Sequence, residues 1–163
     1  MAADAKPFKA LIDPDAPEFV PAGNIPERIR RYCRESGQRV PENEAEIVRC
    51  IDESLAFKYR MTLEEIKMCT GREYPAIHMV GGGTQSGLLC QMTANACHCP
   101  VIAGPVEATV LGNAAVQLLA AGELRDLDQV RSVAGASAKV SIYEPKDTDQ
   151  WEQVYGQYKK MLE

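Results

Sequence analysis

The chain has 163 residues, a formal net charge of −5, and 45% hydrophobic and 25% charged residues, which is the composition of an ordinary folded domain. Its Lys and Arg residues are scattered, so there is no basic patch of the kind that binds nucleic acid. No apolar run approaches the ~20 residues of a membrane span. The start, MAADAKPFKALIDPD, lacks the basic and apolar segments of a signal peptide. These features predict a cytoplasmic protein with neither nucleic acid nor a membrane as partner.

The first 25 residues contain four prolines and few periodic apolar positions, which predicts a proline-rich arm over residues 1–25. Residues 26–163 are then expected to form one lobe. Its first helix begins at Pro26, a residue favoured in the first turn of a helix, and stops at Gly37.

A much longer helix is predicted from about residue 42 to residue 69. Its apolar positions recur every three or four residues, which predicts one buried stripe. The stripe consists of Ile47, Val48, Ile51, Leu55, Tyr59, Leu63 and Ile66. Gly71 is the expected stop.

The middle of the chain alternates strand and helix. Strands are predicted at 76–80 and 100–103, and helices at 85–96 and 107–121, which implies parallel pairing of the strands with helices packed on the sheet. Two strands alone do not form a stable sheet, so either a third strand lies at 139–143, the best candidate, or the missing strands belong to another part of a larger protein. The tail, residues 147–163, is amphipathic and predicts a helix that docks on the core through Trp151, Val154, Tyr155, Tyr158 and Leu162.

The six cysteines are irregularly spaced, which favours reduced thiols over a disulfide framework. Cys33 and Cys50 lie on neighbouring predicted helices, and a bridge between them stays open because the sequence does not give their Cα separation. The triplet Cys97-His98-Cys99 has metal-ligand residue types. A structural zinc site needs four ligands with characteristic spacing, so we expect buried thiols here and no metal site.

Three consecutive glycines, Gly81 to Gly83, separate the first strand of this region from its helix. A dinucleotide fingerprint needs a glycine where this chain has Ser86, and its ribose carboxylate is missing unless Glu107 supplies it. A Walker-type loop fails because no Gly-Lys-Ser/Thr follows. Two interpretations stay open: a tight packing turn, or a seat for a nucleotide whose phosphates approach the backbone at a helix N-terminus.

The segments VGGGTQSGLLCQMTANA and PVIAGPVEATVLGNAAVQLLAAG resemble the C-terminal domain of FGGY-type carbohydrate kinases, and among them most closely the rhamnulokinases. The segments PFKALIDPDAPEFVPAGNIPERIRRYC, PENEAEIVRCIDESLAFKYR and IYEPKDTDQWEQVY extend the resemblance over nearly the whole chain. The resemblance implies an α/β fold: a ribonuclease-H-like (actin-like ATPase) C-terminal lobe with a partial mixed sheet and packed helices. It also implies transfer of the γ-phosphoryl group of ATP, with Mg²⁺, to the 1-position of L-rhamnulose in rhamnose metabolism.

Carried over residue by residue, the resemblance places the ATP contact on Gly81, Gly82 and Gly83, with Gln85 and Ser86 beside the nucleotide. It assigns no catalytic residue and no metal ligand to this chain.

The stretch from Glu107 to Gly112 matches a second family motif, E-A-T-x-L-G. Within it we expect Gly112 to allow close helix packing and Thr109 to cap the helix.

The chain departs from the family at one point. Family members are several times longer and carry upstream an acidic-Gly-Thr/Ser phosphate hairpin and an aspartate that acts as general base, and neither segment is present here. We therefore expect the chain alone to be inactive and to self-associate through the face that the absent domain leaves open. A non-catalytic nucleotide-sensing or partner-docking module is the alternative.

Overall fold

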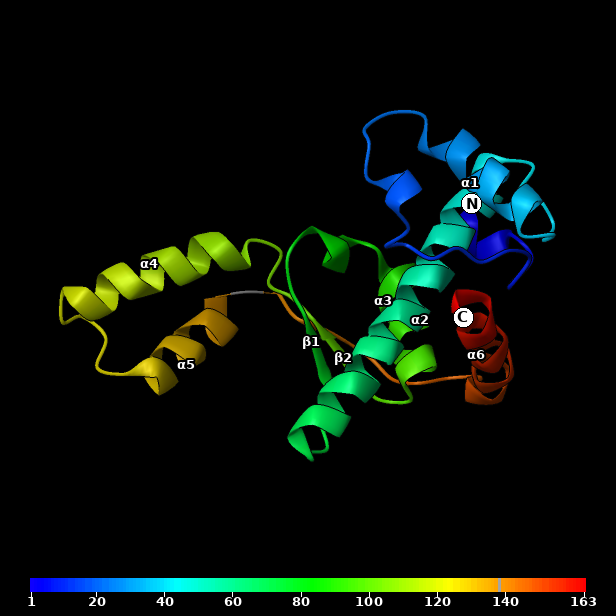
Figure 1. Ribbon diagram of the computed structural model, residues 1–163. Coiled ribbons are helices and arrows are strands. Elements are labelled where there is room, and N and C mark those ends of the chain that lie inside the picture. The colour runs from blue at the N-terminus through cyan, green and yellow to red at the C-terminus, as the bar shows by residue number, and fades with distance from the viewer. Residues whose placement is uncertain (138) are drawn as a thin grey trace.

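The computed structural model describes residues 1–137 and 139–163, which form a mixed α/β body with a helical hairpin projecting from it (Figure 1). The helices and strands in chain order are α1 (Ile25–Glu35), α2 (Glu44–Thr70), β1 (Ile77–Met79), α3 (Gly87–Cys97), β2 (Val101–Ala103), α4 (Ala108–Ala120), α5 (Leu127–Ser137), β3 (Ser141–Tyr143) and α6 (Thr148–Leu162). Short 3-10 helices lie at Ala2–Asp4, Pro17–Phe19 and Gly82–Gln85. None of the helices in the described ranges is long and apolar enough to cross a bilayer.

The three strands form one small sheet in the order β1-β2-β3. β1 and β2 are parallel, whereas β3 runs antiparallel to β2. Helix α3 connects the parallel pair and packs on the sheet, where Cys90 and Ala94 contact Val101 and Ala103 in a buried cluster. The predicted strand–helix–strand unit and the predicted third strand are therefore confirmed.

Helix α2 begins and ends at the residues that the sequence indicates. The side chain of Asn43 accepts a hydrogen bond from the Glu46 amide at 3.0 Å, which satisfies a free donor of the first turn. Gly71, in the left-handed region at φ +64°, ends the helix.

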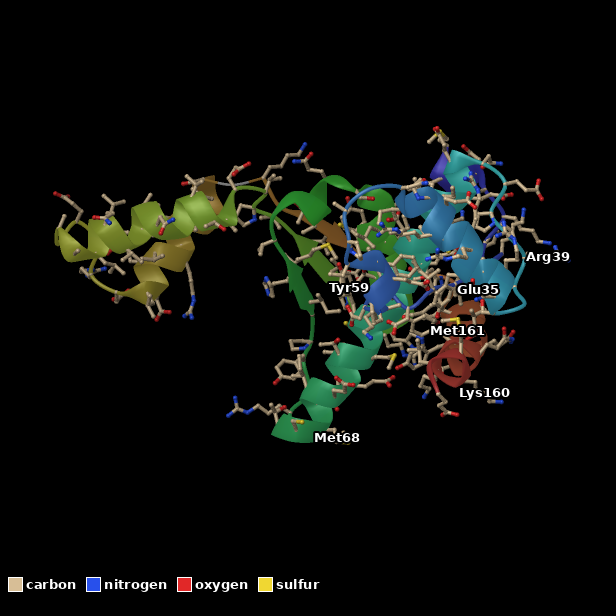
Figure 2. All side chains as sticks on the ribbon, turned by 45° about the horizontal axis from the view of Figure 1, so that its top comes forward. Glu35, Arg39, Tyr59, Met68, Lys160 and Met161 are labelled. Carbon is tan, nitrogen blue, oxygen red and sulfur yellow. The ribbon has the colours of Figure 1, made fainter. Side chains whose placement is uncertain are left out.

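The predicted apolar stripe of α2 is wrong in part. Asp52, Glu53 and Ser54 are buried in the middle of the helix, whereas Tyr59 and Ile66 are exposed. The N-terminal half of α2 is covered on more than one side by the arm and α3. Its C-terminal end extends beyond this cover, as the position of Met68 in Figure 2 illustrates. The difference arises because the spacing of apolar residues indicates only one buried face of a helix. It does not show how many other elements pack around the helix.

The N-terminal arm packs into the core through its backbone. The amide of Phe8 donates to the Glu53 carboxylate at 2.9 Å, and the amide of Ile12 donates to the Ser54 hydroxyl at 2.9 Å. The intervening Ala10 and Leu11 are buried. The polar residues in the middle of α2 are thus the partners of backbone groups that the arm brings into the interior.

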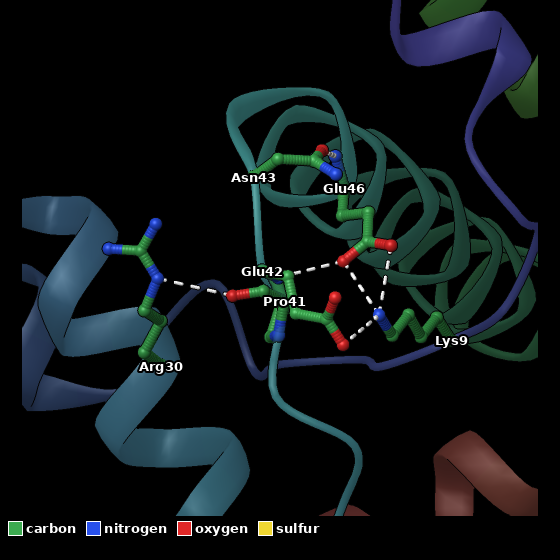
Figure 3. A network of polar contacts seen from close by, with 6 residues as sticks. All are labelled: Lys9, Arg30, Pro41, Glu42, Asn43 and Glu46. Atoms are coloured by element: carbon green, nitrogen blue, oxygen red, sulfur yellow. Dashed lines mark hydrogen bonds and ion pairs between the residues drawn. The ribbon is translucent and has the colours of Figure 1, made fainter.

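A polar network ties the arm to the start of α2 (Figure 3). The ammonium group of Lys9 lies 2.8 Å from the Glu46 carboxylate and 3.2 Å from that of Glu42. The same Glu46 carboxylate accepts from the Glu42 amide at 2.7 Å. Arg30 of α1 donates to the Pro41 carbonyl at 3.1 Å, so α1, the arm and α2 are joined at one point.

Helix α6 docks as its amphipathic pattern predicts. Trp151, Tyr155 and Tyr158 are buried and form an aromatic cluster with Phe57 of α2, with ring centroids 5.0 to 5.9 Å apart. The predicted members Val154 and Leu162 pack partly buried against this cluster.

The hairpin of α4 and α5 projects away from the sheet (Figure 1), and neither helix has a buried residue. Two expectations for α4 are therefore wrong. A Cβ at Gly112 would meet nothing within 4 Å, so this glycine serves no close helix packing within the chain. The residue before α4 is Glu107, with no side-chain cap, so Thr109 is not a cap either.

The six cysteines are free thiols. Cys33 and Cys50 are both buried in the cluster beneath the arm. The hydrogen bond that the Cys50 thiol donates to Cys33, together with burial, raises the pKa of the Cys50 thiol. In the part of the chain that the structure describes, no three His, Cys, Asp or Glu side chains form a group that could hold a metal ion.

Candidate nucleotide-binding site

The glycine turn begins directly after β1. Gly81 lies in the left-handed region at φ +81°, and its amide donates to the Pro105 carbonyl at 3.1 Å. The carbonyl of Gly81 in turn accepts from both the amide and the hydroxyl of Thr84, at 3.1 and 2.7 Å. These bonds hold a single turn of 3-10 helix, Gly82–Gln85, at the carboxyl end of the strand.

The outer side of this turn is open. A Cβ built on Gly81, Gly82 or Gly83 would meet nothing within 4 Å. Only Gly81 has a backbone conformation that favours glycine, so neither packing within the chain nor backbone strain requires glycine at the other two positions. The amides of Gly82 and Gly83 donate to no acceptor within the described residues. The turn therefore presents free donors to a surface without side chains, the arrangement that suits an approaching anion.

Helix α3 starts immediately behind the turn. The Ser86 hydroxyl accepts a hydrogen bond from the Leu89 amide at 3.2 Å and so caps the helix. Gln85 is exposed. The partial positive charge of the helix N-terminus lies next to the free amides of the turn, and both features favour a negatively charged ligand.

Gly104 is a further residue that positions the turn, and sequence reasoning placed it only in a loop. At φ +127°, a Cβ there would lie 2.6 Å from the backbone carbonyl oxygen of Lys139. Its amide donates to Met79 at 2.9 Å, and the following Pro105 accepts from Gly81. The loop after β2 thus braces the end of β1 and the turn together. The Gly-Pro pair signals a turn in the sequence, but the contact with Lys139 depends on where β3 lies.

The turn carries no carboxylate. Glu107 lies exposed just before α4, and residues 81–86 contain only glycines, Thr84, Gln85 and Ser86. Since Mg²⁺ in nucleotide sites is held by one or two carboxylates together with the phosphates and water, these residues fit the phosphates of a nucleotide but not a metal ion by itself.

Comparison with known proteins identifies the family of the chain. The profile of the "FGGY family of carbohydrate kinases, C-terminal domain" matches residues 1–121. The chain belongs to this family. A rhamnulokinase of Bacteroides thetaiotaomicron is 41% identical over 157 residues, covering 96% of this chain and 32% of the relative. The chain thus spans about a third of the length of that relative.

Solved structures of FGGY kinases share the fold. A ligand-bound xylulose kinase from Lactobacillus acidophilus superposes with a TM-score of 0.60 at 20% identity, covering 73% of this chain and 24% of the other. A gluconate kinase from the same organism gives a TM-score of 0.59 at 19% identity, covering 75% and 25%. The predicted fold class, an actin-like ATPase lobe with a partial mixed sheet, is confirmed. The dinucleotide alternative loses its support, since this FGGY chain also lacks the required glycine and ribose carboxylate.

Proposed function

We propose that this FGGY-family chain is the nucleotide-binding C-terminal part of a rhamnulokinase. In the intact cytoplasmic enzyme, the γ-phosphoryl group of ATP is transferred to the 1-hydroxyl of L-rhamnulose, giving L-rhamnulose 1-phosphate. The sugar assignment rests on the similarity to the rhamnulokinase of Bacteroides thetaiotaomicron over 96% of this chain. No residue described above recognises a sugar.

The observation that carries the nucleotide assignment is the open glycine turn at the start of α3. In the proposal, the free amides of Gly82 and Gly83 donate to oxygens of the nucleotide, and Gly81 shapes the turn that exposes them. The exposed amide of Gln85 and the hydroxyl of Ser86, which can donate while its oxygen caps the helix, provide polar contacts beside the nucleotide.

Mg²⁺ would enter together with the nucleotide. It would supply charge neutralisation for phosphoryl transfer. The residues of this chain orient the nucleotide by hydrogen bonds from the backbone and contribute no ligand of their own to the metal.

The chain by itself is expected to be inactive. Phosphoryl transfer needs the nucleotide, the acceptor hydroxyl and a base to be positioned together, and this chain corresponds to 32% of the length of its rhamnulokinase relative. Nucleotide binding is expected to be weak, because a facing domain normally supplies much of the burial in a cleft.

An amide NMR titration of the labelled chain with Mg-ADP, repeated with NADH, tests the nucleotide site. Shifts confined to the glycine turn and the start of α3, with ADP only, are expected. Gly82→Ala should lower the affinity at least about tenfold, since its methyl group would displace a phosphate from hydrogen-bond distance of the amide. Gly156→Ala in α6 is the matched control, because a Cβ there also meets open space. An equal response to NADH, or unchanged affinity of Gly82→Ala, would contradict the proposal.

A nucleotide-sensing or partner-docking module without phosphoryl transfer is the second candidate, favoured by the projecting hairpin of α4 and α5, whose helices have no buried residue. The two candidates differ when the upstream domain of an FGGY rhamnulokinase is added. ADP release that depends on ATP and L-rhamnulose should appear with both parts and be absent with this chain alone. ADP release by the chain alone would refute the expected inactivity. If ADP is released neither by the chain alone nor by the two parts together, the non-catalytic module is favoured.

A further inference from the structure

A cavity of about 420 Å³ lies between the N-terminal arm, the loop after α1, and α6, within the size range of small-molecule sites. Its apolar lining includes Phe8, Leu11, Val154 and Met161. None of its lining residues belongs to the glycine turn, so the proposed function does not account for it.

Three cationic side chains and no carboxylate line this cavity. Lys9 is already paired with Glu42 and Glu46. Arg39 and Lys160 take part in none of the ion pairs or hydrogen bonds formed by the described residues, and both are exposed. The cavity therefore offers two positive charges that the protein itself does not neutralise.

Figure 2 shows Arg39, Met161 and Lys160 on the side of the molecule where the loop after α1 approaches α6. Glu35 lies in the same region, but it does not line the cavity and forms no ion pair among the described residues. An external anion is thus the available partner for both charges.

The walls of the cavity are held in place by Gln38. Its side-chain oxygen accepts from the Leu11 amide at 2.8 Å, and its nitrogen donates to the Leu11 carbonyl at 2.8 Å and to the Ser36 hydroxyl at 2.9 Å. The same nitrogen lies 3.4 Å from the sulfur of Met161 in α6. One side chain therefore joins all three segments, and the cavity is preformed.

Tyr158 forms the floor of the cavity. Its side chain lines the cavity but is fully buried, and its ring stacks on Phe57 of α2 with the ring centroids 5.2 Å apart. The hydroxyl has no surface open to a ligand, so Tyr158 fixes the shape of the floor and takes no part in the recognition of charge.

We infer that this cavity binds a small amphipathic organic anion. A carboxylate or phosphoryl group pairs with Arg39 and Lys160. An apolar body of the ligand lies against Phe8 and Val154.

The single tryptophan of the chain reports on the cavity. Trp151 packs edge-on against Phe8, with ring centroids 4.8 Å apart, so a ligand that displaces Phe8 changes the fluorescence of Trp151. Octanoate and phenyl phosphate are titrated as the two headgroup classes, with inorganic phosphate and benzyl alcohol as separate arms. We expect a saturable change with at least one of the amphipathic anions, and a much weaker response to the other two compounds.

Variants locate the binding. Arg39→Gln together with Lys160→Gln should weaken binding about tenfold or more. Arg34→Gln together with Lys146→Gln removes the same charge elsewhere on the surface and should have little effect.

Several results would overturn the inference: no saturable change, benzyl alcohol or inorganic phosphate binding as tightly as the amphipathic anions, or unchanged affinity after the Arg39 and Lys160 substitutions. Gly82→Ala should leave this binding intact. If it removes the phenyl phosphate signal and octanoate gives none, the probe binds at the glycine turn and the cavity carries no site.

Discussion

Gly104 and Gly82 are glycines for different physical reasons. At Gly104 a side chain is excluded by a backbone carbonyl of a neighbouring segment, whereas at Gly82 the space in front of the backbone is empty. The first is a requirement of the fold. The second has no structural reason within the chain, which is why it supports a binding role.

We expect Gly104→Ala to lower the free energy of unfolding by about 1–3 kcal/mol, because its Cβ would overlap the Lys139 carbonyl and Ala is strained at φ +127°. Gly112→Ala, in the exposed helix α4, is the control and should stabilise by up to ~1 kcal/mol. Urea unfolding of both variants measures the difference. Equal midpoints would show that the loop after β2 moves freely away from Lys139.

Glu53 makes the free energy of unfolding depend on pH. Its carboxylate is 1% exposed, and burial raises its pKa from 4.5 to about 6 despite the opposing hydrogen bond from Arg49. The folded state therefore binds this proton more tightly than the unfolded state. The stabilising contribution is present below pH 4.5 and is lost as the pH rises through about 6.

In Glu53→Gln this loss should disappear. Relative to the wild type, the variant should gain about 2 kcal/mol in unfolding free energy between pH 4.5 and pH 7. Gln has only one carboxamide oxygen, whereas the two oxygens of Glu53 accept separately from Phe8 and Arg49, so a constant cost is superimposed at every pH. Denaturant unfolding of both proteins between pH 4.5 and pH 7 measures how the unfolding free energy depends on pH. Parallel curves for the wild type and Glu53→Gln would contradict the prediction.

At the scale of elements, α6 is held by its aromatic face. Trp151→Ala removes a buried indole that packs on Phe8 and Phe57, and should cost about 3–5 kcal/mol. Gln153→Ala, exposed on the same helix, should change stability by less than ~0.5 kcal/mol. Thermal melts followed by circular dichroism compare the two. A small effect of Trp151→Ala would mean that α6 contributes little to the folded core.

Helix α5 is not among the helices predicted from the sequence. Its apolar residues Leu127, Val130 and Val133 recur every three residues, but none of them is buried. Its N-terminal signal is also present, since the Asp126 carboxylate accepts a hydrogen bond from the Gln129 amide at 2.8 Å, as at the start of a capping box. Together these two signals would have located the helix.

For the whole molecule, the exposed apolar surface has a consequence for assembly. In α4, Val110 and Val116 are each 62% exposed, and Val80 at the end of β1 is 53% exposed. These side chains leave apolar surface uncovered on the hairpin and at the end of β1, and uncovered apolar surface promotes association. We propose that the chain self-associates through it.

Sedimentation velocity at increasing protein concentration should show a rising average sedimentation coefficient. Replacing Val110 and Val116 by Lys should reduce this rise. Replacing the polar residues Asn113 and Gln117 of the same helix by Lys adds the same charge without removing apolar surface, so it should reduce the rise less. A coefficient independent of concentration in the wild type would rule out self-association.

The sequence alone determined the local elements and the family. The caps of α2, the alternation of β1, α3 and β2, and the aromatic face of α6 follow from residue spacing and from single residues such as Asn43 and Gly71, because hydrogen bonding at helix ends and side-chain periodicity are local properties. The glycine turn and the segments around it likewise indicate an FGGY kinase lobe from the sequence alone.

Only the tertiary structure decided which surfaces are covered. The burial of Asp52 and Glu53, the exposure of α4, the contact that requires Gly104, and the cavity lined by Tyr158 all depend on segments far apart in the chain. The pairing of Glu53 with Phe8 joins positions 45 residues apart, and Tyr158 meets Leu11 in one cluster although they lie at opposite ends of the chain. The spacing of residues close together in the sequence does not indicate contacts between distant segments. Burial depends on how many elements surround a side chain, and this is decided only when those segments pack together.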